Sequence, residues 1–264
     1  MSLKTWSDQA AVLFKREIKN RLAYRMTLVF GIVSGFSGLI SYGFLGSSAV
    51  TSVTSNTYGM GLESFLVSGV AFSSIITTGP SLFLHHSNAS QIEEILVTPT
   101  GFKTYLLTSS ILDILAGIGG AALLFAFSIL LLGLNFSYNL PLLSAILALG
   151  VASSVGLGFI GLGLQLVYKQ TAIVSWVLFT LTGLAGNMIV PLQVLPEFVQ
   201  SISLFIPQYY FFTGIRLALG SNVTSFTSIL LIFTAYALVL LGLGIVVLNH
   251  GIRSIRHNGT HRWV

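Results

Sequence analysis

Long uncharged apolar runs, separated by short polar segments, dominate the chain and determine its predicted architecture. Each run is about 20 residues long, enough to cross roughly 30 Å of hydrocarbon as a helix. Six helical spans are predicted on this basis, at Thr27–Leu45, Phe65–Leu84, Ile114–Leu134, Leu142–Val167, Ala172–Leu192 and Phe226–Leu248. The pattern therefore indicates an all-α, multi-pass membrane protein.

The composition supports this fold class. Hydrophobic residues make up 54% of the 264 residues and charged residues only 7%, whereas a soluble domain carries about 25% charged residues. The 27 glycines favour close helix packing in lipid, which depends on small residues. The chain has no cysteine, which excludes disulfides, a thiolate metal site and a thiol nucleophile.

The basic residues predict the orientation in the membrane. Arg216 alone falls on the side away from the termini, and the other eleven of the twelve share the terminal side: Lys4, Lys15, Arg16, Lys19, Arg21, Arg25, Lys103, Lys169, Arg253, Arg256 and Arg262. Lysine and arginine are enriched in cytoplasmic loops, so both termini are predicted to be cytoplasmic in a cell membrane, with Ser47–Tyr58 and Gln193–Ser225 facing out. The net charge of +5 is then topological and argues against a nucleic-acid partner.

The segment before the first span is predicted to be an amphipathic helix on the inner membrane surface. Apolar residues recur on one side and charged residues lie on the other: Leu3, Trp6, Ala10, Leu13 and Phe14 against Lys4, Asp8, Lys15 and Lys19. Two roles remain open, a surface anchor and a lever that transmits motion into the first span. Glu17 falls on the apolar side, so we expect a basic partner for it, with Lys103 or Lys169 as candidates.

Two outward segments differ in character. Gly46–Ser64 is rich in serine and threonine and carries no strong structural signal, whereas Gln193–Ser225 is too apolar for a solvated loop. Its apolar stretches are too short to span and are broken by prolines. This pattern predicts a reentrant pair of short helices in the outer leaflet, between the fifth and sixth spans.

No catalytic or nucleotide-binding motif is present, including the phosphate-binding loop and the zinc-protease helix. Spans two, four, five and six carry no charged residue well inside the span. Ion pumps and proton-coupled carriers need charged residues there, so the sequence argues against a transporter of that kind. The energy source is therefore predicted to lie elsewhere. Asp113 is predicted at the inner edge of the third span, where an interfacial role and a proton-relay role both remain open.

The cytoplasmic loop HHSNASQIEEILVTPTGFKTYLL combines charge with apolarity. Ser90 can cap a short helix whose first turn carries Glu93 and Glu94, and Pro99 ends it. The loop is unusually apolar for a solvated connector because it also contains Ile92, Ile95, Leu96 and Val97. A short amphipathic helix presented to a cytoplasmic partner accounts for both features, with a solvated connector as the alternative.

Three segments carry a family resemblance that covers nearly the whole chain. They are FKREIKNRLAYR (Phe14–Arg25), IEEILVTP (Ile92–Pro99) and VPLQVLPEFVQSISLFIPQYYFFTGIR (Val190–Arg216). In these the chain resembles permease subunits of the ABC-2 family of ATP-binding-cassette exporters, whose loop pattern is E-x-L-x-x-T-P and whose outer signature is built on spaced prolines and a terminal arginine. One departure is Ile206-Pro207-Gln208, which stands where Asn-Pro-Leu is usual.

The resemblance implies a single ABC-2 type transmembrane domain over residues 1–264, without a nucleotide-binding domain. Residues 1–25 would be the connecting helix, 91–99 the coupling helix that docks on the ATPase, and 193–225 the extracellular reentrant segment. The residues implied for these roles are Phe14, Lys15, Arg16 and Glu17 in the connecting helix; Gln91, Ile92, Glu93, Glu94, Ile95, Leu96, Val97 and Pro99 in the coupling helix; and Pro191, Leu195, Pro196, Pro207, Tyr210 and Arg216 in the reentrant motif.

The same resemblance implies the partners. A separate cytoplasmic ATPase would bind ATP and magnesium, so this chain itself would hold no cofactor, and a second permease, identical or related, would complete the pathway across the lipid membrane. Spans one, two and five would line that pathway with Ser34, Ser68, Ser73, Ser175, Thr180 and Asn187. These uncharged faces suit a lipid-like, drug-like or glycolipid substrate. The alternatives are an ATP-independent pore or scaffold and an intramembrane transferase, which would need paired carboxylates or a metal cluster.

Overall fold

The computed structural model describes residues 3–48, 52–85, 102–168, 180, 183, 185–221 and 226–258. Over these residues the chain is helical without a strand, which confirms the all-α prediction for this part. The elements are α1 (Leu3–Ala23), α2 (Arg25–Ser48), α3 (Ser52–Tyr58), α4 (Leu62–His85), α6 (Phe102–Leu132), α7 (Leu140–Tyr168), the 3₁₀ helix η1 (Leu192–Val194), α9 (Glu197–Ser203), α10 (Pro207–Ala218) and α11 (Phe226–Asn258).

Among the described residues, five helices contain stretches long and apolar enough to cross a membrane. These stretches are Val29–Ser48, Leu62–Gly79, Thr108–Leu132, Leu140–Tyr168 and Phe226–Ser254. They coincide with five of the six predicted spans. The third predicted span began too late, since its helix starts at Phe102 and its apolar stretch at Thr108, so Asp113 lies inside the stretch and not at its edge.

The remaining predicted span, Ala172–Leu192, lies mostly outside the described residues, but its end is visible and was placed too late. Residues 186–190 form a series of bends, not a helix. The backbone of Asn187 adopts a φ of 58°, a left-handed conformation that asparagine tolerates better than most residues and that a right-handed helix does not contain. The chain therefore leaves the helix before η1 begins.

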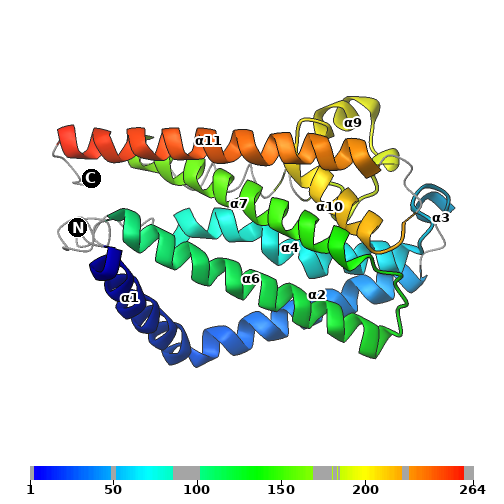
Figure 1. The fold of residues 1–264 in the computed structure, drawn as a ribbon. Helices are drawn as coiled ribbons and strands as arrows, with labels where there is room; N and C mark the ends of the chain where they lie inside the picture. Colours follow the sequence, from blue (N-terminus) through cyan, green and yellow to red (C-terminus); the bar gives the residue numbers. More distant parts are fainter. Residues whose placement is uncertain are drawn as a thin grey trace.

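The long helices run beside one another, and the short elements gather at one end (Figure 1). Both termini lie at the end of the bundle opposite α3 and α9. Helix α3 lies in the stretch Gly46–Ser64, for which the sequence carried no strong structural signal. The arrangement separates the predicted inward and outward segments to opposite ends of the bundle.

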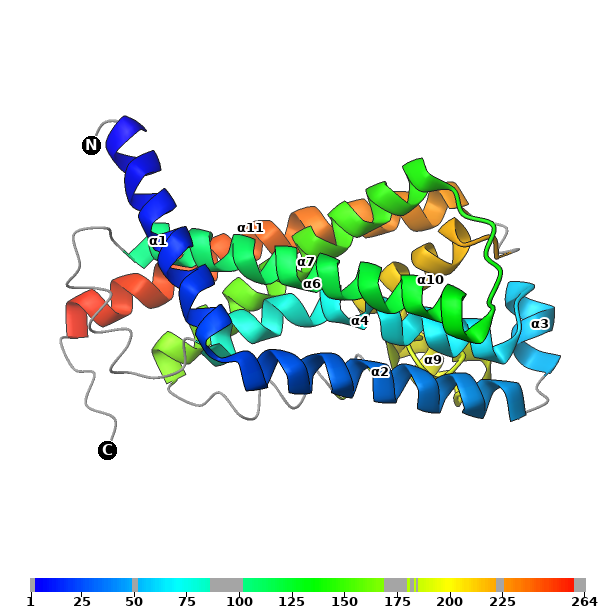
Figure 2. The same ribbon diagram turned by 90° about the horizontal axis from the view of Figure 1, so that it is seen from below.

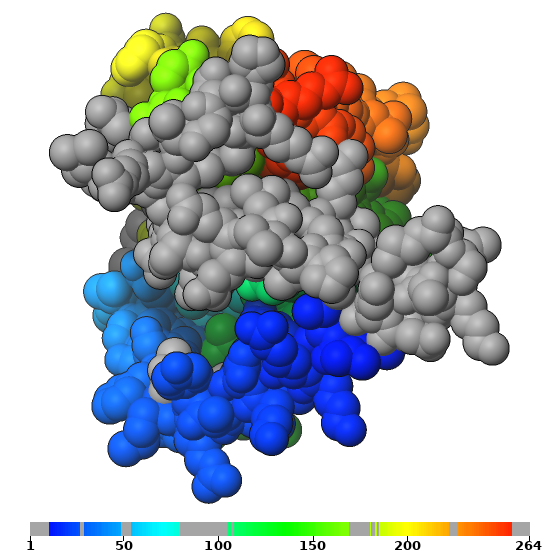
Figure 3. All heavy atoms as spheres, turned by 90° about the vertical axis from the view of Figure 1, so that its left-hand side faces the viewer, coloured from blue at the N-terminus to red at the C-terminus, as the bar shows by residue number. Residues whose placement is uncertain are grey.

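Helix α1 does not continue the direction of the bundle. It crosses one end at an angle, and the chain changes direction sharply at the non-helical residue Tyr24 before α2 follows the bundle edge (Figure 2). Viewed from that end, the N-terminal part of the chain occupies one side and α11 the opposite side (Figure 3). Helix α1 packs chiefly on the start of α6.

Small residues let the long helices approach closely. A Cβ atom at Gly156 would lie 2.6 Å from the backbone of Leu240, and one at Gly163 would lie 2.7 Å from that of Val247. Helices α7 and α11 therefore touch backbone to backbone, as the glycine content predicts for a lipid environment without a hydrophobic drive between helices. Helix α4 packs between α6 and α7, and α10 contributes Phe211 to the core cluster beside it.

Candidate functional site

A buried arginine holds together the end of the bundle that carries α3 and α9. The Arg216 side chain, on α10, is 0% exposed. Its Nη1 donates to the carbonyl of Asn187 at 2.6 Å, and its Nη2 donates to the carbonyl of Met188 at 2.9 Å. Nη2 also lies 3.1 Å from the carbonyl oxygen of Phe65 on α4, and the guanidinium carbon stands 3.5 Å from the centre of that residue's ring. The guanidinium therefore ties α10 to α4 and to the bent segment 186–190.

Asn187 organises the same region through its side chain. It is 0% exposed, and its Nδ2 donates to the hydroxyl oxygens of Tyr58 at 3.0 Å and of Thr213 at 3.1 Å. Its Oδ1 accepts from the backbone N–H of Leu192 at 3.3 Å. One amide thus connects α3, α10 and the start of η1.

Together these contacts explain how a broken backbone can lie inside the bundle. Non-helical backbone at membrane depth is tolerated only where protein satisfies its polar groups. Arg216 supplies donors to two carbonyls of the bent segment, and Asn187 supplies an acceptor to η1. The charge pattern placed Arg216 as the one basic residue of the segment predicted to face out, and the structure shows that its side chain lies in the interior of the protein.

The other residues of the predicted reentrant motif differ in burial. Pro191 is buried, Leu195 is half-buried and Pro196 is exposed before α9. Pro207 is the first residue of α10, where its missing N–H costs no helical hydrogen bond. Tyr210 is buried and donates its hydroxyl to the carbonyl of Leu204 at 2.8 Å, which closes the turn between α9 and α10.

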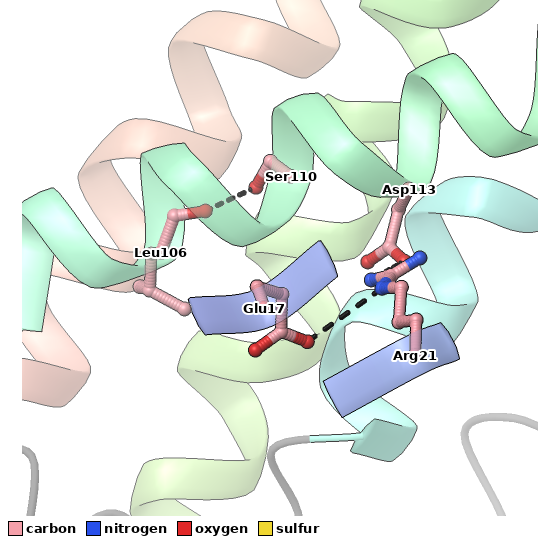
Figure 4. Close-up of polar contacts among 5 residues, drawn as sticks. All are labelled: Glu17, Arg21, Leu106, Ser110 and Asp113. Atoms are coloured by element: carbon pink, nitrogen blue, oxygen red, sulfur yellow. Dashed lines mark hydrogen bonds and ion pairs between the residues drawn. The ribbon is translucent and has the colours of Figure 1, made fainter. Parts of the chain in front are cut away.

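A second polar cluster lies at the opposite end, where α1 meets α6 (Figure 4). Arg21 Nη2 lies 2.6 Å from Asp113 Oδ1, and Arg21 Nε lies 3.6 Å from Glu17 Oε1. Asp113 is 6% exposed, and its Oδ2 has no hydrogen-bond partner among the described residues. A buried carboxylate requires a paired charge, so Arg21 couples α1 to α6, the helix that contains Asp113.

This cluster resolves the question of a partner for Glu17. A basic partner was expected and is present, but it is Arg21, one turn further along the same helix. The side chains of Lys103 and Lys169 lie outside the described part of the structure. Burial raises the pKa of the neighbouring Tyr105 above its ordinary value, and the Glu17 carboxylate raises it further, so the phenol remains neutral at physiological pH.

The residues predicted for the connecting helix divide between two faces of α1. Phe14 and Glu17 are half-buried toward the bundle, whereas Lys15 and Arg16 are exposed. A small cleft between α1 and α6 is lined by Leu13, Arg16, Glu17, Tyr105, Thr108 and Ser109. The half-buried face thus packs on α6, and the lysine projects from the bundle.

The predicted pathway residues do not share one surface. Ser34 is exposed on α2, and Ser73 and Thr180 are half-buried. Ser68 is buried and bonded to the carbonyl of Phe65 at 2.9 Å, and Asn187 belongs to the interior cluster above. In this conformation Ser68 and Asn187 therefore form part of the interior of the chain, and Ser175 lies outside the described residues.

The predicted coupling residues Gln91, Ile92, Glu93, Glu94, Ile95, Leu96, Val97 and Pro99 also lie outside the described residues. Within the part of the chain that is described, no group of three metal-ligating side chains is present. Sequence patterns gave no indication of the contacts of Tyr58 and Thr213, or of the Arg21–Asp113 pair. The one available signal was the rarity of charges in apolar stretches, which singles out Asp113 and Arg216.

Comparison with known protein families gives one match. Residues 8–220 match the family model described as ABC-2 type transporter. The matched range includes most of α1, the Asp113 cluster and the Arg216 cluster. No curated protein matches the chain.

Proposed function

Since this chain belongs to the ABC-2 type transporter family, we propose that it is the permease subunit of an exporter in a cell membrane. It moves a lipid-like, drug-like or glycolipid substrate outward, using ATP that a separate cytoplasmic ATPase binds with magnesium and hydrolyses. The family match over residues 8–220 carries the proposal, and members of this family generally work with an ATPase partner.

The state of the buried charges supports an external energy source. Among the described residues, Asp113 and Arg216 are the buried charged side chains. Asp113 is paired with Arg21, and Arg216 is held by backbone carbonyls. A proton- or ion-driven carrier needs an intramembrane group that loads and releases its ion, and both of these groups are already engaged.

We place the end of the bundle with the two termini in the cytoplasm, because eleven of the twelve basic residues belong to that side. The natural chain has no cysteine, so single cysteines can be introduced at Ser55 and at His257 without background labelling. An impermeant thiol reagent added outside intact cells should label the first and not the second. Labelling of both from outside would contradict the proposed topology.

ATP-driven motion enters through residues 91–99 and through α1. Ile95, Leu96 and Val97 supply the apolar anchor of a small contact with the ATPase, and Glu93 and Glu94 pair with basic groups at its rim. Loss of a central apolar anchor commonly costs about 2 kcal/mol or more, whereas an exposed ion pair contributes about 0–1 kcal/mol. The apolar residues should therefore dominate assembly.

The experiment is copurification of the ATPase, with transport measured in parallel. Leu96→Asp should abolish both and leave membrane insertion intact, whereas Glu93→Ala with Glu94→Ala should mainly slow association. Thr100→Asp adds the same charge just beyond the predicted docking helix and is the matched control. Normal ATPase recovery and transport for Leu96→Asp would show that residues 91–99 are a solvated connector and would remove the proposed coupling route.

Two such permeases, identical or closely related, form the working unit. On α2, a Cβ atom at Gly31 would meet nothing within 4 Å, and the neighbouring Phe30 and Val33 are exposed. This small, apolar face is suited to close approach by a second subunit in lipid. A monomeric mass for a transport-active preparation in a native lipid disc would exclude the dimer.

A further inference from the structure

Helix α4 contains a proline, Pro80, five residues before its end, and the helix continues past it to His85. Pro80 has no N–H, so the carbonyl of Ile76, four residues earlier, lacks its usual helical donor. An unsatisfied carbonyl inside a membrane is costly because no water is available to bond it. The hydrogen bonds around residues 76–80 therefore need a donor from another element.

Ser154 of the neighbouring helix α7 supplies that donor. Its Oγ donates to the Ile76 carbonyl at 2.8 Å and accepts from the N–H of Gly79, also at 2.8 Å. Thr78 Oγ1 lies 3.2 Å from Ser154 Oγ. The serine is 0% exposed, so one interhelical hydroxyl bonds to backbone groups of α4 on either side of Thr78, at the turn that the proline interrupts.

The backbones at this point are in direct contact. A Cβ atom at Gly79 would overlap the carbonyl of Ser154, and one at Gly158 would lie 2.5 Å from the carbonyl oxygen of Gly79. This close approach is what allows a side chain as short as serine to reach into the helix of its neighbour. The contact is between helices, so it changes when α4 and α7 move relative to one another.

We propose that α4 has a hinge at Ile76–Pro80 and that Ser154 is its positioning residue. The Ser154 hydroxyl replaces the backbone hydrogen bond that the proline removes, and it thereby holds the two parts of α4 in their present orientation. Helices bend where a proline or an inserted side chain interrupts the i→i−4 ladder. In this proposal the end of α4 after Pro80 moves about the hinge, while the part before Ile76 stays packed against its neighbours. The use of the hinge in transport rests on the proposed function, because α4 leads directly from the bundle to the segment 86–101, which contains the predicted coupling residues.

Hydrogen–deuterium exchange of the purified full chain in lipid nanodiscs tests the hinge without any ATPase. Ser154→Ala leaves the Ile76 carbonyl without a donor, and amides of the turns flanking Pro80 should exchange roughly five- to tenfold faster. Pro80→Ala restores an N–H to that carbonyl, so it should slow exchange when made alone. In the double variant it should cancel the effect of Ser154→Ala.

The matched control is Ser153→Ala. Ser153 is 1% exposed and precedes Ser154 in α7, but its hydroxyl donates to the carbonyl of Gly150 in its own helix at 3.0 Å. Exchange in α4 should be unchanged in this variant. Equal effects of the two alanine substitutions, or a failure of Pro80→Ala to rescue Ser154→Ala, would overturn the positioning role.

ATP hydrolysis by the complex purified with its ATPase then tests whether the hinge is used. Pro80→Ala stiffens α4 without removing a buried contact of Ser154, and it should lower turnover at least tenfold while the ATPase still copurifies. Normal turnover for Pro80→Ala would overturn the role of the hinge in transport. If no ATPase partner is found, the exchange results still decide whether Ser154 positions α4, so failure of the hinge and failure of the proposed function are distinguishable.

Discussion

The Arg216 cluster allows a quantitative prediction, since the side chain is fully buried and its acceptors are known. Replacing Arg216 with alanine removes the donors to the carbonyls of Asn187 and Met188. The carbonyl of Phe65 still accepts from the Ser68 hydroxyl at 2.9 Å, so two acceptors lose a partner and not three. Each buried acceptor left without a partner costs about 1–3 kcal/mol.

Two further effects act in opposite directions. The alanine variant loses the cation–π contact with Phe65, which contributes about 2 kcal/mol when desolvated, and leaves a cavity. It also avoids the cost of burying a guanidinium, which is several kcal/mol. We therefore expect Arg216→Ala to lower the free energy of unfolding by about 3–5 kcal/mol. Arg216→Lys should lower it by about 2 kcal/mol, because a lysine keeps the charge but not the fork of donors.

The assay is unfolding in mixed detergent micelles by titration with sodium dodecyl sulfate, followed by circular dichroism. Arg253→Ala is the matched control, because Arg253 is exposed on α11, and it should change the unfolding free energy by no more than about 0.5 kcal/mol. The loss in the free energy of unfolding should be largest for Arg216→Ala, smaller for Arg216→Lys and smallest for the Arg253→Ala control. Equal stability of Arg216→Ala and Arg253→Ala would refute the conclusion that the guanidinium holds the bent segment in place.

Substitutions at three further contacts test the remaining parts of the structure. Asn187→Gly keeps the left-handed backbone conformation and loses only the side-chain bonds, so it should lower the free energy of unfolding by about 1–2 kcal/mol. Asn187→Ala also disfavours that conformation and should lower the free energy of unfolding further. Equal thermal unfolding of the two variants would show that the conformation carries no strain. Arg21→Ala leaves the Asp113 carboxylate buried and unpaired and should cost about 3–5 kcal/mol in the same unfolding assay. Adding Asp113→Asn should recover part of that loss, and strictly additive losses would mean that the two side chains do not interact. Gly163→Leu should separate α7 from α11 and lower the melting temperature in nanodiscs. Gly242→Leu is the control and should not lower it, because a Cβ atom at Gly242 meets nothing within 4 Å. Equal melting temperatures of the two variants would contradict the backbone contact.

The sequence by itself determined the fold class, five of the spans and the separation of the predicted inward and outward segments to opposite ends of the bundle. These depend on local properties, because the hydrophobicity of about 20 consecutive residues decides whether a segment can cross lipid. The proline spacing after the fifth span likewise predicted short helices there, and the structure has α9 and α10 in that segment. Helix boundaries were less accurate, as at Ile114, where hydropathy alone excluded a charged residue that the helix in fact contains.

The tertiary structure alone decided which polar groups meet. Arg21 bonds to Asp113, which is 92 residues away in the sequence, and Arg216 bonds to the carbonyl of Phe65, which is 151 residues away. Ser154 of α7 bonds to the carbonyl of Ile76 in α4, which is 78 residues away. No periodicity in the sequence predicts such pairs, because they depend on which helix faces pack together and on where each residue lies along the bundle axis. The physical reason is that a charge or a carbonyl in lipid must find its partner within the protein, and only the packed bundle brings that partner within hydrogen-bonding distance.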